Sequence, residues 1–281
     1  MDTIPHKVTG SGDHTVFWLH GWFGSSSAWG SMPRMLDGDR FRHIFVDYRG
    51  HGQRRTEGGD YTLDEIAADV LALAEDLGVD RFSLVGHSMG GAGALRVLSQ
   101  APDRVHRIVG IAPVGATPTP FDEPTRELFF GAPDDREKRY AIVDFTTRNR
   151  NTESWVNRTV AHSMEQSSTE AFRGHLKSWA EADFADDLTG VTVPALVIVG
   201  EHDRVLDEET VRQTWGCGAA RCPDRGDGER RPLPRRRDPG ADRDRGGALP
   251  GRGRLIRSRR PGDLGSRPGA AHGTLPGGGF A

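Results

Sequence analysis

Long apolar runs and cysteines are scarce in this sequence, and each scarcity excludes a class of protein. No segment approaches the roughly 18 consecutive apolar residues that a membrane-spanning helix requires, so we expect no membrane partner. The chain does not begin with a basic segment followed by an apolar run, which is the pattern of a secretion signal, and we therefore expect a cytoplasmic location. Two cysteines in 281 residues do not build a disulfide framework.

Positive charge is concentrated near the C-terminus. Residues 216–281 contain 15 arginines against six aspartates and one glutamate, a net charge of +8, whereas the whole chain carries −3. The same 66 residues contain 16 glycines and eight prolines and show no apolar periodicity. Such a composition buries too little apolar surface to offset the entropy lost on ordering. We therefore expect 216–281 to be an aberrant tail that is disordered or frameshifted.

Before this tail, short apolar runs alternate with amphipathic segments. Residues 63–77 place Ile66, Val70 and Leu73 on one helical face, and Thr62 is a candidate N-cap. Strands that alternate with helices predict an α/β protein with a mostly parallel sheet covered by helices on both faces. The expected strands are 15–19, 43–46, 82–85, 105–113 and 193–200.

The alternation stops between positions 114 and 186. Four amphipathic segments follow one another there without a strand, so we expect a helical lid inserted into a core of residues 1–113 and 187–215. The four segments are 122–130, 138–147, 152–165 and 168–182. Aromatic side chains of this lid either line an acyl pocket or pack the lid against the sheet. They are Phe129, Phe130, Phe145, Trp155, Phe172 and Trp179.

The sequence Gly-His-Ser-Met-Gly-Gly at positions 86–91 lies between an expected strand and an expected helix. This context turns the weak pattern G-x-S-x-G into the prediction of a nucleophile elbow. Glycines on both sides permit a tight turn that places Ser88 in a strained conformation above the sheet. The helix N-terminus at this point favours a developing oxyanion. A glycine-rich turn without chemistry is the alternative interpretation.

Three further motifs join the elbow, and together the four resemble the α/β-hydrolase superfamily over about residues 15–215, in particular its small, lid-bearing serine esterase-like members. His-Gly-Trp-Phe-Gly-Ser at 20–25 resembles the oxyanion loop, and Asp-Tyr-Arg-Gly-His-Gly at 47–52 resembles a structural turn. Val-Gly-Glu-His-Asp at 199–203 resembles the turn that carries the acid of the catalytic triad. The resemblance implies the α/β-hydrolase fold, with its C-terminal strand and helix lost from this chain.

The resemblance also implies a role for each motif residue. Ser88 would be the nucleophile, and Asp203 would be the acid that holds a basic histidine. The backbone N–H groups of Trp22 and Met89 would form the oxyanion hole. No metal and no cofactor are implied. Structural roles fall to His20, Gly21, Asp47, Gly50, Gly52, Gly86 and Gly90.

The basic histidine is missing from the place that the resemblance gives it, near position 232. Arg231 and Pro232 stand there instead. His272 is the only histidine that follows Asp203, and it lies far beyond the expected place. The general base is therefore either His272 or a histidine that this reading of the gene has lost.

A shift of reading frame accounts for both the missing histidine and the unusual tail. Residues 229–234 can be encoded by GAA-CGC-CGG-CCA-CTA-CCC, and these bases read one position later as Asn-Ala-Gly-His-Tyr-Pro. The same offset lets 235–239 encode Asp-Glu-Glu-Thr-Pro, which suits the start of a final helix. We therefore hypothesise a frameshift near codon 216.

These inferences favour a serine hydrolase that cleaves a carboxylic ester, thioester or lactone of a small molecule through an acyl-enzyme intermediate. The same fold hosts C–C bond hydrolases, perhydrolases and lyases, so the fold alone does not choose among them. A haloalkane dehalogenase is disfavoured because Ser88, not a carboxylate, occupies the elbow. A catalytically impaired hydrolase fold with a nonspecific basic tail is a further alternative. Nucleic-acid binding is not expected, because Phe280 is the only aromatic residue of the tail.

Overall fold

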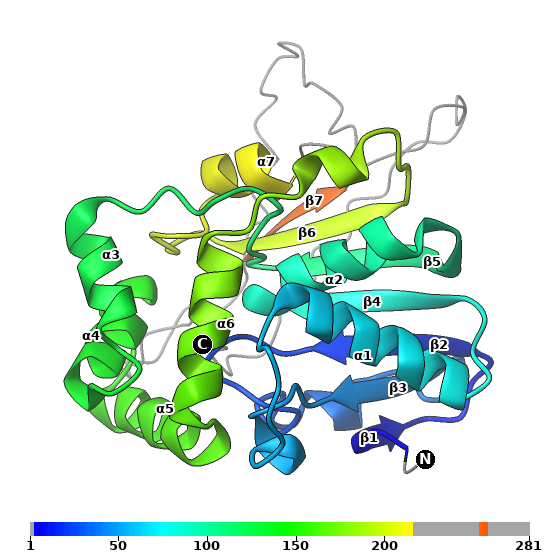
Figure 1. The fold of residues 1–281 in the computed structure, drawn as a ribbon, viewed down its shortest axis with the longest axis horizontal. Coiled ribbons are helices and arrows are strands. Elements are labelled where there is room, and N and C mark those ends of the chain that lie inside the picture. The colour runs from blue at the N-terminus through cyan, green and yellow to red at the C-terminus, as the bar shows by residue number, and fades with distance from the viewer. Residues whose placement is uncertain (1–2, 216–252, 258–281) are drawn as a thin grey trace, which may run out of the picture.

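A computed structural model describes residues 3–215 and 253–257, and it arranges the strands of these residues in one sheet (Figure 1). The order across the sheet is β1-β3-β2-β4-β5-β6-β7. Strands β2 to β6 pair in parallel, whereas β1 and β7 run antiparallel at the two edges. The strands are β1 (His6–Thr9), β2 (His14–Leu19), β3 (Phe41–Val46), β4 (Phe82–His87), β5 (Val105–Ile111), β6 (Ala195–Gly200) and β7 (Gly253–Arg257).

The five strands expected from apolar runs correspond to β2 through β6. The sequence pattern predicts neither β1 nor β7. Strand β1 has the short, largely polar sequence His-Lys-Val-Thr, and β7 belongs to the arginine-rich tail. Within the described residues, β6 pairs with β5 on one side and with the antiparallel β7 on the other. The final parallel strand that the fold implies therefore has no counterpart there.

Two helices, α1 (Leu63–Asp76) and α2 (Met89–Gln100), pack together on one face of the sheet (Figure 1). Thr62 caps α1 by accepting a hydrogen bond from the Glu65 amide at 3.1 Å, which satisfies one of the unpaired donors of the first turn. The apolar stripe of α1 that the sequence predicts is buried against the sheet. Burial of this stripe holds α1 in place.

The opposite face of β2 and β3 is covered by residues 24–40, which contain a 3-10 helix (Met32–Met35). Trp29 of this segment packs edge-on against Trp18 of β2, with ring centres 5.0 Å apart. Phe45 of β3 stacks on the other side of Trp18 at 5.4 Å. This second apolar cluster fixes the path of the chain immediately after the first expected site motif.

Four helices form an insertion (residues 114–186) between β5 and β6, at one end of the sheet (Figure 1). They are α3 (Glu123–Phe130), α4 (Arg136–Thr146), α5 (Glu153–Gln166) and α6 (Thr169–Ala180), and α7 (Glu208–Trp215) follows β6. Each helix of the insertion begins at a side-chain N-cap, namely Asp122, Asp135, Thr152 and Ser168. The Ser168 amide donates to the Gly50 carbonyl at 2.8 Å, which joins α6 to the turn after β3.

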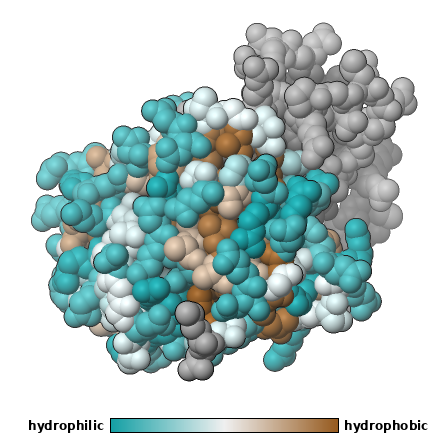
Figure 2. Space-filling model, turned by 45° about the vertical axis from the view of Figure 1, so that its right-hand side comes forward, coloured by the Kyte–Doolittle hydropathy of each residue, from teal (hydrophilic) through white to brown (hydrophobic). Residues whose placement is uncertain are grey.

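The surface is mainly hydrophilic on the face drawn in Figure 2, with hydrophobic residues in a narrow band between polar ones. Among the described residues, the exposed large apolar side chains are those of Val8, Met35 and Met164. No helix in this part of the chain is long and apolar enough to cross a bilayer.

Candidate active site

Ser88 lies between β4 and α2 in a backbone conformation that residues other than glycine rarely adopt. Its φ is +52° and its ψ is −121°, a region that costs a non-glycine residue on the order of 1–3 kcal/mol. The Ser88 amide donates to the Ile111 carbonyl at 3.0 Å, and the Ser88 carbonyl accepts from the Gly91 amide at 2.8 Å. Ser88 is partly exposed, whereas His87 and Met89 are buried. The turn therefore presents Ser88 rather than its neighbours.

Two glycines let the strand and the helix approach closely enough to form this turn. A Cβ atom on Gly86 would lie 2.2 Å from the Gly90 carbonyl oxygen, and a Cβ atom on Gly90 would lie 2.2 Å from the Leu19 carbonyl oxygen. Both distances are shorter than any contact that a side chain tolerates. The two positions accept only glycine, as the motif predicts.

The loop after β2 passes directly beside Ser88. A Cβ atom on Gly21 would lie 3.3 Å from the Ser88 Cβ atom. The next residue, Trp22, is buried. Within residues 3–215, the backbone N–H groups of Trp22 and Met89 have no hydrogen-bond acceptor outside the regular helices and strands. These two residues adjoin Gly21 and Ser88.

The Trp22 side chain is held by the helical insertion. Its indole Nε1–H donates to the Phe172 carbonyl at 2.7 Å, and its ring stacks on the Phe172 ring with centres 3.9 Å apart. Phe129 and Trp179 also surround Trp22, and both are buried. These three lid aromatics pack the insertion against the loop after β2, while Phe130, Phe145 and Trp155 are partly buried. An acyl pocket lined by these residues stays a prediction.

Asp203 lies in the turn that follows β6, and β5 separates this strand from β4 and Ser88. Its Oδ1 atom accepts hydrogen bonds from the amides of Val205 at 2.9 Å and Leu206 at 2.8 Å. Among the described residues, Oδ2 accepts none. Burial raises the pKa of the Asp203 carboxyl above its ordinary value, against the opposing effect of the two amides.

Asp47 connects the turn at 47–52 with the loop after β2 through hydrogen bonds of its carboxylate. Its carboxylate accepts from the Ser26 amide at 2.5 Å, the Ser26 hydroxyl at 3.0 Å and the Gln53 amide at 3.1 Å. Gly52 has a φ of +53°, and a Cβ atom there would lie 2.3 Å from the Asp47 carboxylate. Gly50 also has a positive φ, of +75°. The turn thus connects the end of β3 to the loop that contains Gly21.

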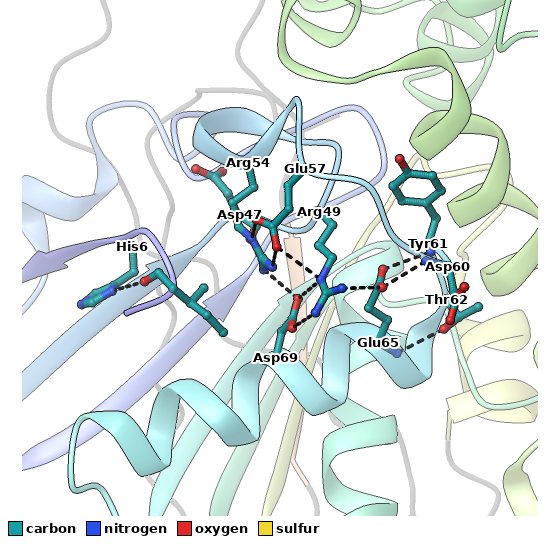
Figure 3. Close-up of polar contacts among 11 residues, drawn as sticks. His6, Asp47, Arg49, Arg54, Glu57, Asp60, Tyr61, Thr62, Glu65 and Asp69 are labelled. Carbon is teal, nitrogen blue, oxygen red and sulfur yellow. Dashed lines mark hydrogen bonds and ion pairs between the residues drawn. The ribbon is translucent and has the colours of Figure 1, made fainter. Parts of the chain in front are cut away.

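Sequence reasoning missed a network of charged side chains behind this turn (Figure 3). Arg54 is buried and donates to Asp69 of α1 at 2.7 Å and to Glu57 at 2.6 Å. Arg49 pairs with the same Asp69 at 2.9 Å and with Glu65 at 3.2 Å. The acidic partners hold the pKa of both guanidinium groups above its ordinary value, despite the opposing burial of Arg54. The network fastens the turn at 47–52 to α1.

Three buried histidines, at or next to the loop after β2, are uncharged at neutral pH. His20 Nδ1–H donates to the Gly21 carbonyl at 2.8 Å, and burial lowers its pKa to about 4. His51 Nδ1–H donates to the Gly24 carbonyl at 3.0 Å, so His51 Nε2 accepts from His175 Nδ1–H at 3.1 Å. Burial lowers the pKa of His175 to about 3 and that of His51 well below its ordinary value. His20 is thus buried and hydrogen-bonded within the loop, and its structural role stays a prediction.

Both candidate positions for the general base lie outside the part of the chain that the structure describes. Both His272 and the arginine-rich stretch near position 232 belong to residues 216–252 and 258–281. Two described histidines adjoin the expected site residues. His202 precedes Asp203 and is partly buried. His87 precedes Ser88, and burial lowers its pKa to about 4. Within the described residues, no group of three or more histidine, cysteine or carboxylate side chains is arranged to hold a metal ion.

Comparisons with known proteins match this geometry to one family. The family model described as alpha/beta hydrolase fold matches residues 14–222. A non-heme haloperoxidase of Rhodococcus erythropolis is 30% identical over 221 residues, which cover 72% of this chain and 79% of that protein. A bifunctional esterase/perhydrolase of Acinetobacter calcoaceticus is 28% identical, covering 69% and 76%. The crystal structure of a bromoperoxidase from Bacillus anthracis superposes with a TM-score of 0.63 at 25% identity, covering 73% and 79%. The chain therefore belongs to the α/β-hydrolase fold family.

Proposed function

We propose that this chain is a serine hydrolase that cleaves a carboxylic ester, thioester or lactone through an acyl-enzyme intermediate. The observation that carries the proposal is the strained backbone of Ser88 at the β4–α2 junction, with Gly21 directly beside it. A strained elbow is the feature that aims a serine at a substrate in this family. Backbone strain of this size persists only where the surrounding structure enforces it, and strained residues cluster at functional sites.

In the proposed reaction, Ser88 Oγ attacks the carbonyl carbon of the substrate and its proton passes to a basic histidine. The carbonyl oxygen becomes an oxyanion that accepts hydrogen bonds from the N–H groups of Trp22 and Met89. The histidine then returns the proton to the leaving alcohol, and water hydrolyses the acyl-enzyme by the same steps. Asp203 would orient the histidine through Oδ2, the oxygen that the described residues leave unoccupied.

The histidine itself is proposed to be encoded in the other reading frame, near codon 232. The family match ends at residue 222. Similarity to the R. erythropolis protein covers 79% of that relative, so about a fifth of it has no matched counterpart here. A frameshift near codon 216 would remove homology over such a segment without changing the preceding residues. His272 is the alternative base.

Comparison of three proteins tests the nucleophile: the unaltered chain, Ser88→Ala and Ser99→Ala. Ser99 lies on the same helix, and its hydroxyl donates to the Arg96 carbonyl at 2.9 Å. We expect a fluorophosphonate probe to label the peptide that contains Ser88. We expect p-nitrophenyl ester hydrolysis to be slow in the unaltered chain, because the proposed histidine is not encoded in this frame, and to be lost only in Ser88→Ala. If neither labelling nor hydrolysis depends on Ser88, the catalytically impaired alternative replaces the proposal.

Perhydrolysis is a second candidate, favoured by the name of the A. calcoaceticus relative. Hydrogen peroxide would replace water as the acceptor of the acyl group, giving a peracid and regenerating the Ser88 hydroxyl. Peracid formation from an ester and hydrogen peroxide, measured for the unaltered chain and Ser88→Ala, distinguishes the two acceptors. Assays of the same two proteins with a diketone and an enol substrate test C–C bond cleavage and lyase chemistry. Reaction of either substrate in the absence of ester turnover would favour these alternatives.

A further inference from the structure

A buried cation in the insertion makes no contact ion pair among the described residues, although the nearby Asp134 carboxylate acts on it through space. Arg139 of α4 is 2% exposed. Its guanidinium donates to the carbonyl oxygens of Ala132 at 3.2 Å and Pro133 at 2.8 Å, and to the Ser163 hydroxyl at 3.1 Å. Burial lowers the pKa of Arg139 to about 10, so the group stays protonated at neutral pH. Burying a charge whose hydrogen-bond acceptors are all neutral costs free energy, and the Asp134 carboxylate offsets this cost only in part, since the pKa of Arg139 is still lowered.

The guanidinium of Arg139 lies over the ring of Phe172, and this ring contacts the loop beside Ser88 through Trp22. The guanidinium carbon lies 3.6 Å from the centre of the Phe172 ring. That ring stacks on Trp22 with centres 3.9 Å apart and planes 22° apart. The Phe172 carbonyl also accepts the Trp22 indole N–H at 2.7 Å. Arg139, Phe172 and Trp22 thus form one continuous stack from α4 to the loop after β2.

We propose that Arg139 and Phe172 are positioning residues that hold Trp22 so that its backbone N–H faces the oxyanion, an inference that rests on the proposed function. A cation over the Phe172 ring strengthens the contact electrostatically, and the double anchor of Trp22 limits movement of its peptide. A rigid insertion would in this way set the geometry of the reaction step.

Equilibrium binding of phenylboronic acid tests this inference without requiring turnover, because the boron atom forms a tetrahedral adduct with a nucleophilic serine. The dissociation constant is measured by calorimetry for the unaltered chain, Ser88→Ala, Arg139→Met and Arg136→Met. Arg136 is the matched control, since it lies on the same helix, is exposed and contacts Asn157. We expect Arg139→Met to weaken binding about 10- to 100-fold, as small displacements in an active site do, and Arg136→Met to change it less than about twofold.

A merely structural role gives a different pattern. Arg139→Met would then lower the melting temperature while the folded fraction binds the boronate as tightly as the unaltered chain, and this result would overturn the inference. Where Arg139→Met does not fold, Phe172→Leu decides, because it removes the ring and keeps an apolar side chain. Equal binding of the boronate by Ser88→Ala and by the unaltered chain overturns the proposed nucleophile instead.

Discussion

His51 and His175 form a hydrogen bond 3.1 Å long between two buried, uncharged rings, one from the turn at 47–52 and one from α6. The contact requires His175 Nδ1 to carry a proton and His51 Nε2 to lack one, because His51 Nδ1–H already donates to Gly24. Protonation of His51 Nε2 would place two donors opposite each other. The junction between the turn and the insertion is therefore sensitive to acid.

We expect the free energy of unfolding to fall as the pH is lowered from about 6.5. The pKa of His175 is lowered to about 3 and those of His20 and His87 to about 4, so the unfolded chain binds protons that the folded chain does not. The slope reaches about 1.4 kcal/mol per pH unit for each such histidine and vanishes above the ordinary pKa. Urea titrations between pH 4 and pH 8 measure it.

The variant His175→Asn can keep a donor toward His51 and cannot be charged, so its stability should depend less steeply on pH in this window. The same substitution at the partly exposed His6 of β1 provides the control and should keep the slope of the unaltered chain. A His175→Asn slope equal to that of the unaltered chain would show that the acid sensitivity arises elsewhere.

Ser88→Gly should be more stable than Ser88→Ala. The φ of +52° and ψ of −121° disfavour any residue with a Cβ atom, and glycine relieves a strain of about 1–3 kcal/mol. The hydroxyl is absent from both variants, so the comparison isolates the backbone term. Chemical denaturation of the two proteins gives the difference, and equal stabilities would mean that the strain is no larger than the roughly 0.5–1 kcal/mol that glycine costs through the entropy of the unfolded chain.

Asp69→Ala should destabilise the fold by about 3–5 kcal/mol, because it leaves the guanidinium of Arg54 without its most buried partner. The Arg54 side chain is 2% exposed and the Asp69 side chain 10%. Asp64→Ala on the same helix removes an exposed pair with Arg96 and should cost less than about 1 kcal/mol. Thermal and urea unfolding of both variants tests the contrast, which fails if the two losses are alike.

Features set by neighbouring residues were predictable from the sequence. The strands of the parallel sheet and the four helices of the insertion follow from apolar runs and helical periodicity, and the structure confirms them. Glycine spacing predicts the tight turn at Ser88, where the structure has a positive φ, while the role of Ser88 as nucleophile stays a prediction. Thr62 was identified as the cap of α1 because its signal is local. Each of these features depends on residues within one turn or one strand of each other.

Features that depend on distant partners were not predictable in the same way. Strand β1 has only four residues and exists through pairing with β3. The contact between Trp22 and Phe172 joins positions 150 residues apart. Arg54 reads as a surface residue in the sequence, and its burial follows from the placement of Asp69 on α1. Composition alone gives no signal for such pairs.

The reading-frame hypothesis makes the most decisive prediction, because it concerns bases rather than contacts. A histidine followed by a tyrosine in the shifted frame requires CCA for Pro232 and CTA or TTA for Leu233, and an insertion or deletion must lie near codon 216. Sequencing of the encoding DNA from codon 203 to the stop tests both requirements.

If these codons are found, restoring the frame should produce a protein with a complete serine–histidine–aspartate set and faster ester turnover than the chain as written. Replacing the restored histidine with glutamine should remove that gain, whereas His272 would be irrelevant because it exists only in the present frame. Other codons at Pro232 and Leu233 would reject the hypothesis. The arginine-rich tail would then be genuine, and loss of ester hydrolysis in His272→Gln would become the test of the base, because no other histidine follows Asp203.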